Sequence, residues 1–486
     1  MMMLASLLAG EPAALVPSRE QMAFTLAYHI ILVPLGVAFP FLTVLMEGIG
    51  LRRNDPAALR LARRWSVVMA VQFAVGAVTG TILSFEFGIL WPRMMGRFGD
   101  VFGIGFAIEG IAFFLEAIFI GVYLYGWRRL PPRLHYALGW VLPPAGLLGA
   151  FGVIIANSWM NTPAGFQLGP TGRPVNVNPA GAIFTPALGY EFWHLIVALY
   201  MTAGFMVASV YAAGWLRGRR DRYHRLGFTV PFTLGAVLAP VQFVVGDIAT
   251  RAVFNDQPAK FGAMEITWLT RSHNPEVVGG IITADGAVHL GLPIPWLDSL
   301  LAGFSPDVVV RGLSTFAAAD RPTILDANFV HLAFDVMVGL GAIACLLTLW
   351  YAAAWLRNRN LPRSVWFFRA AALAGVGSYV GIECGWVTTE VGRQPWIVYG
   401  LMRVGDAVNP VNPSYVWAMF SGLLVMYAVI AYFFITILLR LSARWGLEDE
   451  GRRAEEIRPE SSAPYGPREP RRGTLPGPGE SIDSAR

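Results

Sequence analysis

The sequence predicts an all-α, polytopic membrane protein with about nine transmembrane helices packed in bundles. Of its 486 residues, 55% are hydrophobic and only 14% are charged, an apolar excess that soluble domains could not hide in their cores. The apolar residues gather in windows long enough to cross a bilayer, and arginines gather in every second connection between these windows. We therefore expect the lipid bilayer to be the main solvent, with no nucleic acid as a partner.

Each predicted helix is a run of about 20 apolar residues, the length that crosses roughly 30 Å of hydrocarbon. The windows are 22–48, 66–90, 104–126, 136–158, 188–215, 227–247, 328–356, 366–388 and 414–440. They divide the chain into a lead-in (1–21), helices one to six (22–247), a long loop (248–327), helices seven to nine (328–440) and a tail (441–486). Because the tail is charged and rich in proline and glycine, we expect it to be disordered.

The distribution of arginine predicts the orientation. Basic residues follow the first, third, fifth and seventh windows: Arg52, Arg53, Arg60, Arg63 and Arg64; Arg128, Arg129 and Arg133; Arg217, Arg219, Arg220, Arg222 and Arg225; Arg357, Arg359 and Arg363. Cytoplasmic connections carry an excess of Lys and Arg. The N-terminus is therefore expected outside, the C-terminus in the cytoplasm, and the loop 248–327 outside.

Two histidines lie inside predicted helices, His29 in "LAYHIILVP" and His194 in "YEFWHLIVALY". Each is either a buried histidine hydrogen-bonded to a carbonyl or an axial haem ligand, since neutral imidazole is the usual protein donor to haem iron. Two such histidines together favour haem-binding helix bundles. Met337, on another helix, could complete a His/Met pair, although methionine is more often apolar filler.

Two glutamates lie seven residues apart in "AIEGIAFFLEAIF". On a helix, Glu109 and Glu116 share a face with a rise of about 10 Å between them. Such a stripe could relay protons, because an ionisable group at membrane depth is costly and usually has a task. The alternative is a pair of carboxylic acids kept neutral by burial.

The segment "GWVTTEVGRQPW" places three polar or aromatic residues on one side of a helix that ends near Gly392. Trp386 and Glu390 are four residues apart, and Arg393 follows three residues later. The pair Glu390 and Arg393 is either an ion pair at a helix end or an iron ligand beside an arginine that binds a haem propionate.

A single lysine, Lys260, occurs in the whole sequence, five residues before Glu265 in the loop 248–327. Taken by itself, Lys260 is interpreted as an ordinary solvated loop cation, and the functional alternative rests on the resemblance described below.

The strings "TLAYHIILVP", "IEGIAFFLEA", "IANSWMNTP" and "GRQPW", with the lysine-x4-glutamate of the loop, occur in the order found in a known family. The chain resembles subunit I of cytochrome bd-type quinol oxidases from about Arg19 to about residue 440. The resemblance implies a quinol:oxygen oxidoreductase of the bacterial cytoplasmic membrane. It would oxidise quinol at the outer face and reduce O2 to water with cytoplasmic protons, so that charge is separated without a pump.

The resemblance also implies roles for the residues above. His194 and Met337 would be axial ligands of a low-spin haem b, and His29 and Glu390 ligands of two high-spin haems, one haem b and one haem d or a third haem b. Glu109 would be a carboxylate close to that pair and Glu116 one on the proton path. Trp386 and Arg393 would pack against or pair with the haems. Quinol would bind Lys260, Glu265 and Gln257. A homologous subunit II, sometimes with a very small third chain, would be the partner.

The sequence departs from the family's pattern at several positions. Asp335 stands where better-known members have arginine near the low-spin haem, Ala117 replaces a common serine, and the two glutamates are seven rather than eight residues apart. The external loop resembles the short-loop form, in which haem b can replace haem d. Two other classes would also use buried histidines or acids: a haem-b membrane anchor that passes electrons to a partner protein, and a secondary transporter without haem.

Overall fold

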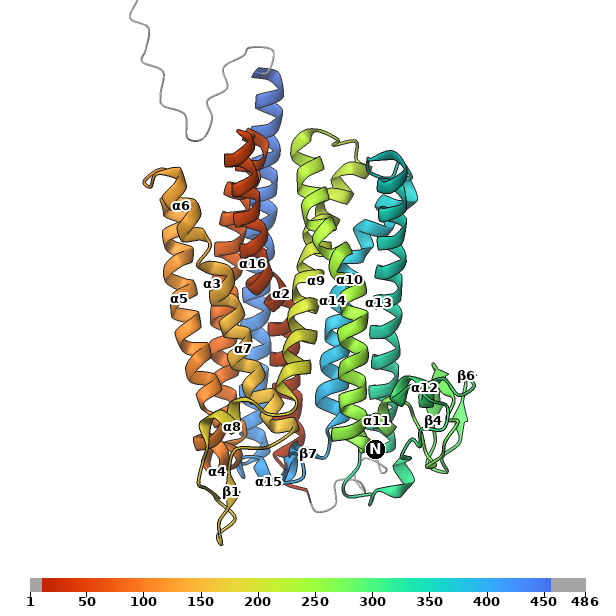
Figure 1. The fold of residues 1–486 in the computed structure, drawn as a ribbon. Coiled ribbons are helices and arrows are strands. Elements are labelled where there is room, and N and C mark those ends of the chain that lie inside the picture. The colour runs from red at the N-terminus through yellow and green to blue at the C-terminus, as the bar shows by residue number, and fades with distance from the viewer. Residues whose placement is uncertain (1–10, 456–486) are drawn as a thin grey trace, which may run out of the picture.

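The computed structural model describes residues 11–455, and it is all-α as predicted (Figure 1). Within these residues, nine helical segments are long and apolar enough to cross a membrane. They are α2 (Leu15–Arg53), α3 (Pro56–Leu90), α5 (Ile104–Gly126), α6 with α7 (Pro132–Gly139 and Leu142–Asn161), α9 (Leu188–Leu216), α10 (Arg222–Asp256), α13 (Ile324–Asn358), α14 (Val365–Gly392) and α16 (Pro413–Glu455).

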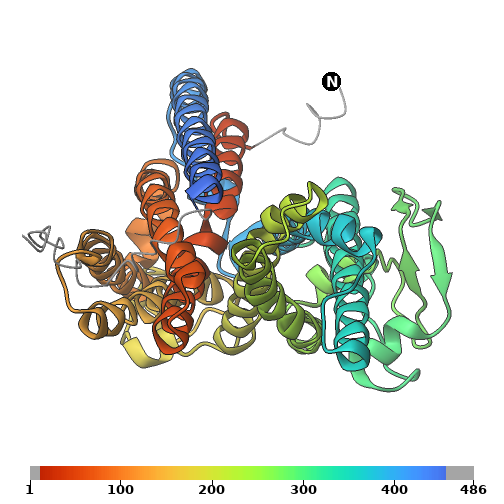
Figure 2. The ribbon, with the colours of Figure 1, turned by 90° about the horizontal axis from the view of Figure 1, so that it is seen from above.

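The helices form two bundles that stand side by side (Figure 2). Helices α2, α3, α5 and α7 make the first bundle, and α9, α10, α13 and α14 make the second, while α16 packs outside against α2 and α3. Aromatic side chains fill the second bundle, where Phe228 and Phe232 stack with ring centroids 5.0 Å apart. Trp386 of α14 packs in a cluster with Ile30 of α2 and Leu199 of α9, and this cluster joins the two bundles.

Side-chain caps fix where several helices begin. Asp55 accepts from the backbone N–H groups of Ala57 and Ala58, ahead of Pro56 in the first turn of α3. Thr323 and Asp326 form a capping box at the start of α13. These caps satisfy backbone donors that no helical carbonyl can reach.

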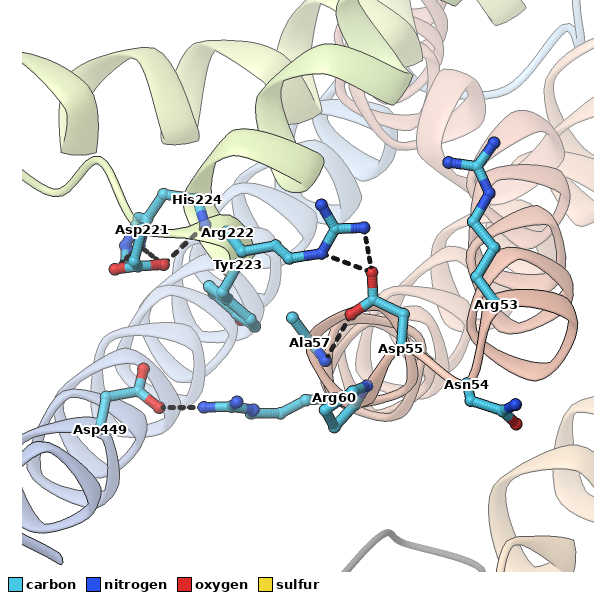
Figure 3. A pocket seen from close by; sticks show the side chains of 11 residues that line it. Arg53, Asn54, Asp55, Ala57, Arg60, Asp221, Arg222, Tyr223, His224 and Asp449 are labelled. Carbon is cyan, nitrogen blue, oxygen red and sulfur yellow. Dashed lines mark hydrogen bonds and ion pairs between the residues drawn. The ribbon is translucent and has the colours of Figure 1, made fainter. Parts of the chain in front are cut away.

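Ion pairs join the arginine-rich segment at the start of α3 to α16 and to α10 at one end of the molecule (Figure 3). Arg64 Nη1 donates to Asp449 Oδ2 at 2.8 Å, and Arg60 Nη1 lies 3.5 Å from Asp449 Oδ1. Arg222 Nε donates to Asp55 Oδ2 at 2.7 Å, which ties α10 to the start of α3. These contacts lie at the end of the molecule that the distribution of arginine predicts to face the cytoplasm.

The structure differs from the predicted boundaries at both ends. Helix α16 continues to Glu455, so residues 441–455 are helical rather than part of a disordered tail, and their pairing with Arg64 gives the physical reason. Helix α2 begins at Leu15, inside the predicted lead-in 1–21. Residues 1–10 and 456–486 lie outside the described residues.

The external loop is shorter than predicted and is folded. Helix α10 ends at Asp256 and α13 begins at Ile324, so both ends of 248–327 are helical. Between them lie α11 (Pro258–Met264), β3 (Glu276–Val278) paired with β6 (Leu292–Ile294), β4 (Ile281–Ile282) paired with β5 (Val288–His289), α12 (Leu297–Gly303) and the short 3₁₀ helix η1 (Leu313–Thr315). The other end-loops hold β1 (Gln167–Leu168), β2 (Pro174–Val175), α4 (Pro92–Phe102), α8 (Pro179–Ile183), β7 (Trp396–Val398), β8 (Met402–Arg403) and α15 (Val404–Ala407).

Three side chains of α13 hold the external loop in place. His331 is fully buried, with Nδ1 2.7 Å from Met264 O and Nε2 2.9 Å from Gly279 O. Asn328 pairs with both the N–H and the C=O of Ile282, at 2.7 and 2.9 Å. Asp335 accepts from the N–H of Gly279. At the position where the family carries arginine, this chain therefore has a carboxylate that anchors the loop backbone.

A buried polar cluster joins α2 and α5 to α6 in the first bundle. His135 Nδ1 lies 2.7 Å from Glu47 Oε1, Tyr123 OH donates to Glu47 Oε2 at 2.7 Å, and both His135 and Glu47 are fully buried. The second ring nitrogen of His135 contacts the carbonyl of Tyr123 at 2.8 Å. Because every partner is withdrawn from water, removing one leaves an uncompensated polar group.

We predict that His135→Ala destabilises the fold by about 3 kcal/mol or more, because it leaves Glu47 with one partner fewer in a buried site. Thermal unfolding of the purified protein in detergent would measure the effect. His224→Ala is the matched control, since its partner Asp221 is 40% exposed and the change should cost below about 1 kcal/mol. Equal melting temperatures for the two variants would contradict the prediction.

Candidate functional site

A cavity of about 780 Å³ lies inside the second bundle and is continuous with the base of the external loop. Its walls come from α9, α10, α13 and α14, and α11, β3 and α12 close its outer end. Five of the predicted site residues line it: His194, Met337, Trp386, Lys260 and Glu265. The cavity thus joins the predicted low-spin haem ligands to the predicted quinol-binding pair.

Two glycines leave room for the predicted haem ligands. A Cβ added to Gly246 of α10 would lie 3.4 Å from Cε1 of His194, and a Cβ added to Gly385 of α14 would lie 3.1 Å from Sδ of Met337. Gln242 Nε2 donates to Nδ1 of His194 at 3.1 Å. Between these residues the cavity wall is predominantly apolar.

Lys260 is buried, with 5% of its surface exposed, which excludes the interpretation as a solvated loop cation. Among the residues that the structure describes, its ammonium forms neither a hydrogen bond nor a salt bridge, although Glu191 and Glu390 are close enough to interact electrostatically. Burial lowers the pKa of Lys260 to about 8, an effect that the charge of Glu191 partly opposes. A buried amine with such a pKa changes charge within the physiological range.

A hydrogen-bond network of residues from the neighbouring helices surrounds Lys260. Asn161, at the end of α7, donates to Glu191 Oε1 at 2.7 Å, and Gln257 Nε2 donates to Asn161 Oδ1 at 3.0 Å. Glu390 accepts from Asn157 Nδ2 at 2.9 Å and pairs with Arg393 three residues later, as the spacing predicted.

Several buried atoms of this network have no partner in the described part of the chain: Glu191 Oε2, Gln257 Oε1 and Arg393 Nη1. An unpaired buried polar atom costs free energy unless a ligand or water satisfies it. The network is therefore suited to hold a polar ligand.

Three carboxyl groups from separate segments meet at the outer end of the cavity. Glu265 caps α11, Glu276 lies in β3 and Asp298 lies in the first turn of α12, with one oxygen from each within 4.8 Å of the others. All three line the cavity. Burial is the largest cause of a raised pKa in each, followed for Glu265 by repulsion from Glu276 and Asp298; the pKa of Asp298 rises to about 7.

The remaining predicted residues lie elsewhere. His29 is in the first bundle, with Nδ1 2.9 Å from Thr79 Oγ1 on α3 and its ring against Gly80. Glu109 and Glu116 lie on one helix, α5, as predicted, and neither forms a hydrogen bond or ion pair within residues 11–455. His29 and Glu390 are on different bundles, which approach each other through α2 and α14.

Sequence reasoning missed four polar residues of the site. Glu191 lies three residues before His194, and Asn161 lies in "IANSWMNTP", so both stand inside motifs that were noted for other reasons. Glu276 and Asp298 carried no signal, because acidic residues in a polar loop are usually solvated. Only the folded loop brings them together.

Comparisons with known proteins agree with this architecture. The family model for cytochrome bd terminal oxidase subunit I matches residues 17–445. The solved bd oxidase of Geobacillus thermodenitrificans superimposes with a TM-score of 0.82 at 33% identity, covering 89% of this chain and 98% of that chain. Cytochrome bd ubiquinol oxidase subunit 1 of Bacillus subtilis is 30% identical over 440 residues, which cover 88% of this chain and 93% of the relative. Cytochrome bd-II ubiquinol oxidase subunit 1 of Escherichia coli is 26% identical over 460 residues, which cover 80% and 88%.

Within residues 11–455, nine membrane-length helices surround a cavity lined by imidazole, thioether and carboxylate groups, an arrangement suited to a haem-binding membrane redox protein. The chain belongs to the cytochrome bd terminal oxidase subunit I family. It is therefore a haem-dependent catalytic subunit of a respiratory quinol:oxygen oxidoreductase in a bacterial membrane.

Proposed function

We propose that quinol is oxidised at the outer end of the 780 Å³ cavity, beside Lys260 and Glu265, and that His194 and Met337 hold a low-spin haem b in the same cavity. The observation that carries this proposal is the shared cavity. Substrate site and predicted haem ligands line one continuous space, so no protein layer separates an electron donor from its acceptor.

Lys260 would bind the substrate, and Glu265 would accept its proton. A protonated Lys260 donates a charge-assisted hydrogen bond to one quinol oxygen, which orients the ring. Glu265 accepts a proton from quinol, and burial raises the pKa of its carboxyl group, which makes the carboxylate a stronger base. Gln257 already donates to Asn161, so its unpaired Oε1 is the atom left for the substrate.

The residues of the cavity fit a haem, because its predominantly apolar walls enclose about 780 Å³ and carry both His194 and Met337. Gly246 and Gly385, which have no side chain, make room for the imidazole and the thioether themselves. By the family resemblance, His29 and Glu390 would hold the high-spin pair, one haem b and one haem d or haem b. When bound, the haems supply electron transfer and the reduction of dioxygen. Arg393, which pairs with Glu390 and keeps Nη1 unpaired, would bind a propionate.

Glu109 and Glu116 would carry protons from the cytoplasm toward the oxygen site. They lie on one face of α5 with a rise of about 10 Å between them, so bound water would have to bridge the gap. Trp386 packs where the two bundles meet, next to Ile30 of α2, and would fix the spacing between the haem sites.

The cellular setting follows from the same family. The ends of α2, α5, α9 and α13 carry the arginines and would face the cytoplasm, while the external loop would face outward. We expect a homologous subunit II, and in some assemblies a very small third chain, to cover part of the apolar surface.

We predict that Lys260→Ala lowers quinol oxidation at least about tenfold, because one charge-assisted hydrogen bond is lost, and leaves the haem spectrum intact. Steady-state oxygen uptake with quinol and a reduced-minus-oxidised spectrum measure the two effects. Arg311→Ala removes an exposed cation of the same loop and serves as the control. Loss of haem with normal quinol kinetics per remaining haem would refute the role of Lys260.

We also predict that kcat/KM for quinol falls as the pH rises through about 8. Lys260 holds the substrate oxygen only when protonated, and burial lowers its pKa to about 8, so the charged form is lost above that value. A pH profile of quinol oxidation in the wild-type protein measures this limb. A flat profile from pH 7 to pH 10 would contradict a pKa of about 8 at the binding cation.

A third prediction concerns the axial thioether. Met337→Leu should remove or strongly alter the low-spin haem band, because leucine keeps the volume and lacks the sulfur donor. Met201→Leu, in the wall of the same cavity, is the matched control and should leave the band unchanged. Identical spectra for the two variants would assign the ligand to another residue.

A further inference from the structure

The cavity has two poles of opposite character at its outer end. One pole is the buried ammonium of Lys260, which forms no hydrogen bond or salt bridge in the described part of the chain. The other, here called the acidic pole, is the group Glu265, Glu276 and Asp298. Glu265 is 4% exposed and Asp298 is 1% exposed, and Glu265 Oε2 and Asp298 Oδ1 find no partner among residues 11–455.

We propose that the acidic pole, and not Glu265 alone, is the acceptor for both protons of quinol, with Glu276 and Asp298 as further catalytic residues. This inference rests on the proposed quinol site. Each turnover breaks two O–H bonds of quinol, passes two electrons to the haem acceptor and leaves quinone. The two protons convert two carboxylates of the acidic pole into carboxylic acids.

The position of each carboxyl group supports a route outward. Glu265 is buried at the end of the helix that carries Lys260. Glu276 lies in the loop hairpin, is partly exposed, and is in hydrogen-bond contact with the Glu265 side chain. Asp298 is held by Asn274, whose Nδ2 donates to Asp298 Oδ2 at 2.5 Å. A proton taken up at Glu265 can therefore pass to Glu276 and leave at the outer face.

Charged groups around the acidic pole act on the pKa values of its three carboxyl groups. Asp335 of α13 adds repulsion, and His331 of the same helix and Arg271 add attraction. On α10, Arg251 pairs with Asp247 at 2.6 Å. Burial and mutual repulsion raise the pKa of all three carboxyl groups, to about 7 for Asp298. The raised pKa values make each carboxylate of the group a stronger proton acceptor than a solvated one.

The test compares pH profiles of two variants, Glu276→Gln and Asp298→Asn, in the complete oxidase. Removing one carboxyl group relieves repulsion, so the pKa of the remaining acids falls and the acid limb of quinol oxidation moves to lower pH by about one unit. The double variant leaves Glu265 as the only acceptor and should slow quinol turnover roughly tenfold. Asp307→Asn, an 81% exposed carboxylate of the same loop, is the control and should not move the limb.

A second electron donor separates a proton-accepting role from a structural one. Tetramethyl-p-phenylenediamine gives up an electron without breaking an O–H bond, so the variants should oxidise it with the wild-type pH profile. An unmoved limb with quinol, or the same shift with both donors, would overturn the inference. Inactivation by EDTA that Ca²⁺ reverses would also overturn it, because the acidic pole would then hold a cation. A haem spectrum of each variant shows whether it still binds haem. If one variant loses haem, the pH profile of the other variant tests the inference.

The outcome distinguishes this inference from the proposed function on which it rests. If Lys260→Ala leaves quinol turnover unchanged, the quinol site itself is misplaced. If Lys260→Ala lowers quinol turnover while Glu276→Gln and Asp298→Asn keep the wild-type pH profile, the quinol site stands and only the proposal of a shared proton acceptor is wrong.

Discussion

The cost of removing charge from water is the constraint on which the structure depends. Inside a bilayer each ionisable group needs a partner or a task, because an unpaired charge there is expensive. In this chain, buried ionisable groups are arranged in two ways. In the first bundle, His135, Glu47 and Tyr123 hydrogen-bond to one another. At the base of the external loop, within residues 11–455, Lys260 forms no hydrogen bond or salt bridge and Arg393 Nη1 finds no partner. The first arrangement stabilises the fold, and the second is ready for a ligand.

The two poles at the outer end of the cavity, Lys260 and the acidic pole, offer quinol a hydrogen-bond donor and a proton acceptor. Quinol oxidation separates electrons from protons, so a site for it needs a route for each. Apolar walls around His194 and Met337 suit a haem, and carboxyl groups at the outer end suit protons. In the proposed mechanism both routes would begin at the same short helix, α11, because Lys260 lies in it and Glu265 caps it.

Hydropathy was sufficient to predict nine membrane helices, since about 20 apolar residues in succession have few alternatives in a chain of this composition. It could not place the helix ends. Arg64 and Asp449 are 385 residues apart, and their ion pair extends α16 past the predicted limit at 440. The motifs located His194, Met337, Trp386, Lys260 and Glu265, and the structure brings these five to one cavity. Glu276 and Asp298 could not be predicted, because only the folding of the external loop brings them beside Glu265.

Helix α13 carries both the anchors of the external loop and a proposed axial ligand. His331 and Asp335 bind the loop backbone, and Met337 follows two residues after Asp335 on the same rigid element. The loop therefore cannot swing away like a lid without breaking buried contacts. Under the proposed function, quinol dissolved in the membrane would instead enter between helices, past cavity-lining residues such as Phe243 and Ile343, which are 42% and 60% exposed. The rate at which substrate reaches the site would then depend on the thickness and fluidity of the surrounding lipid.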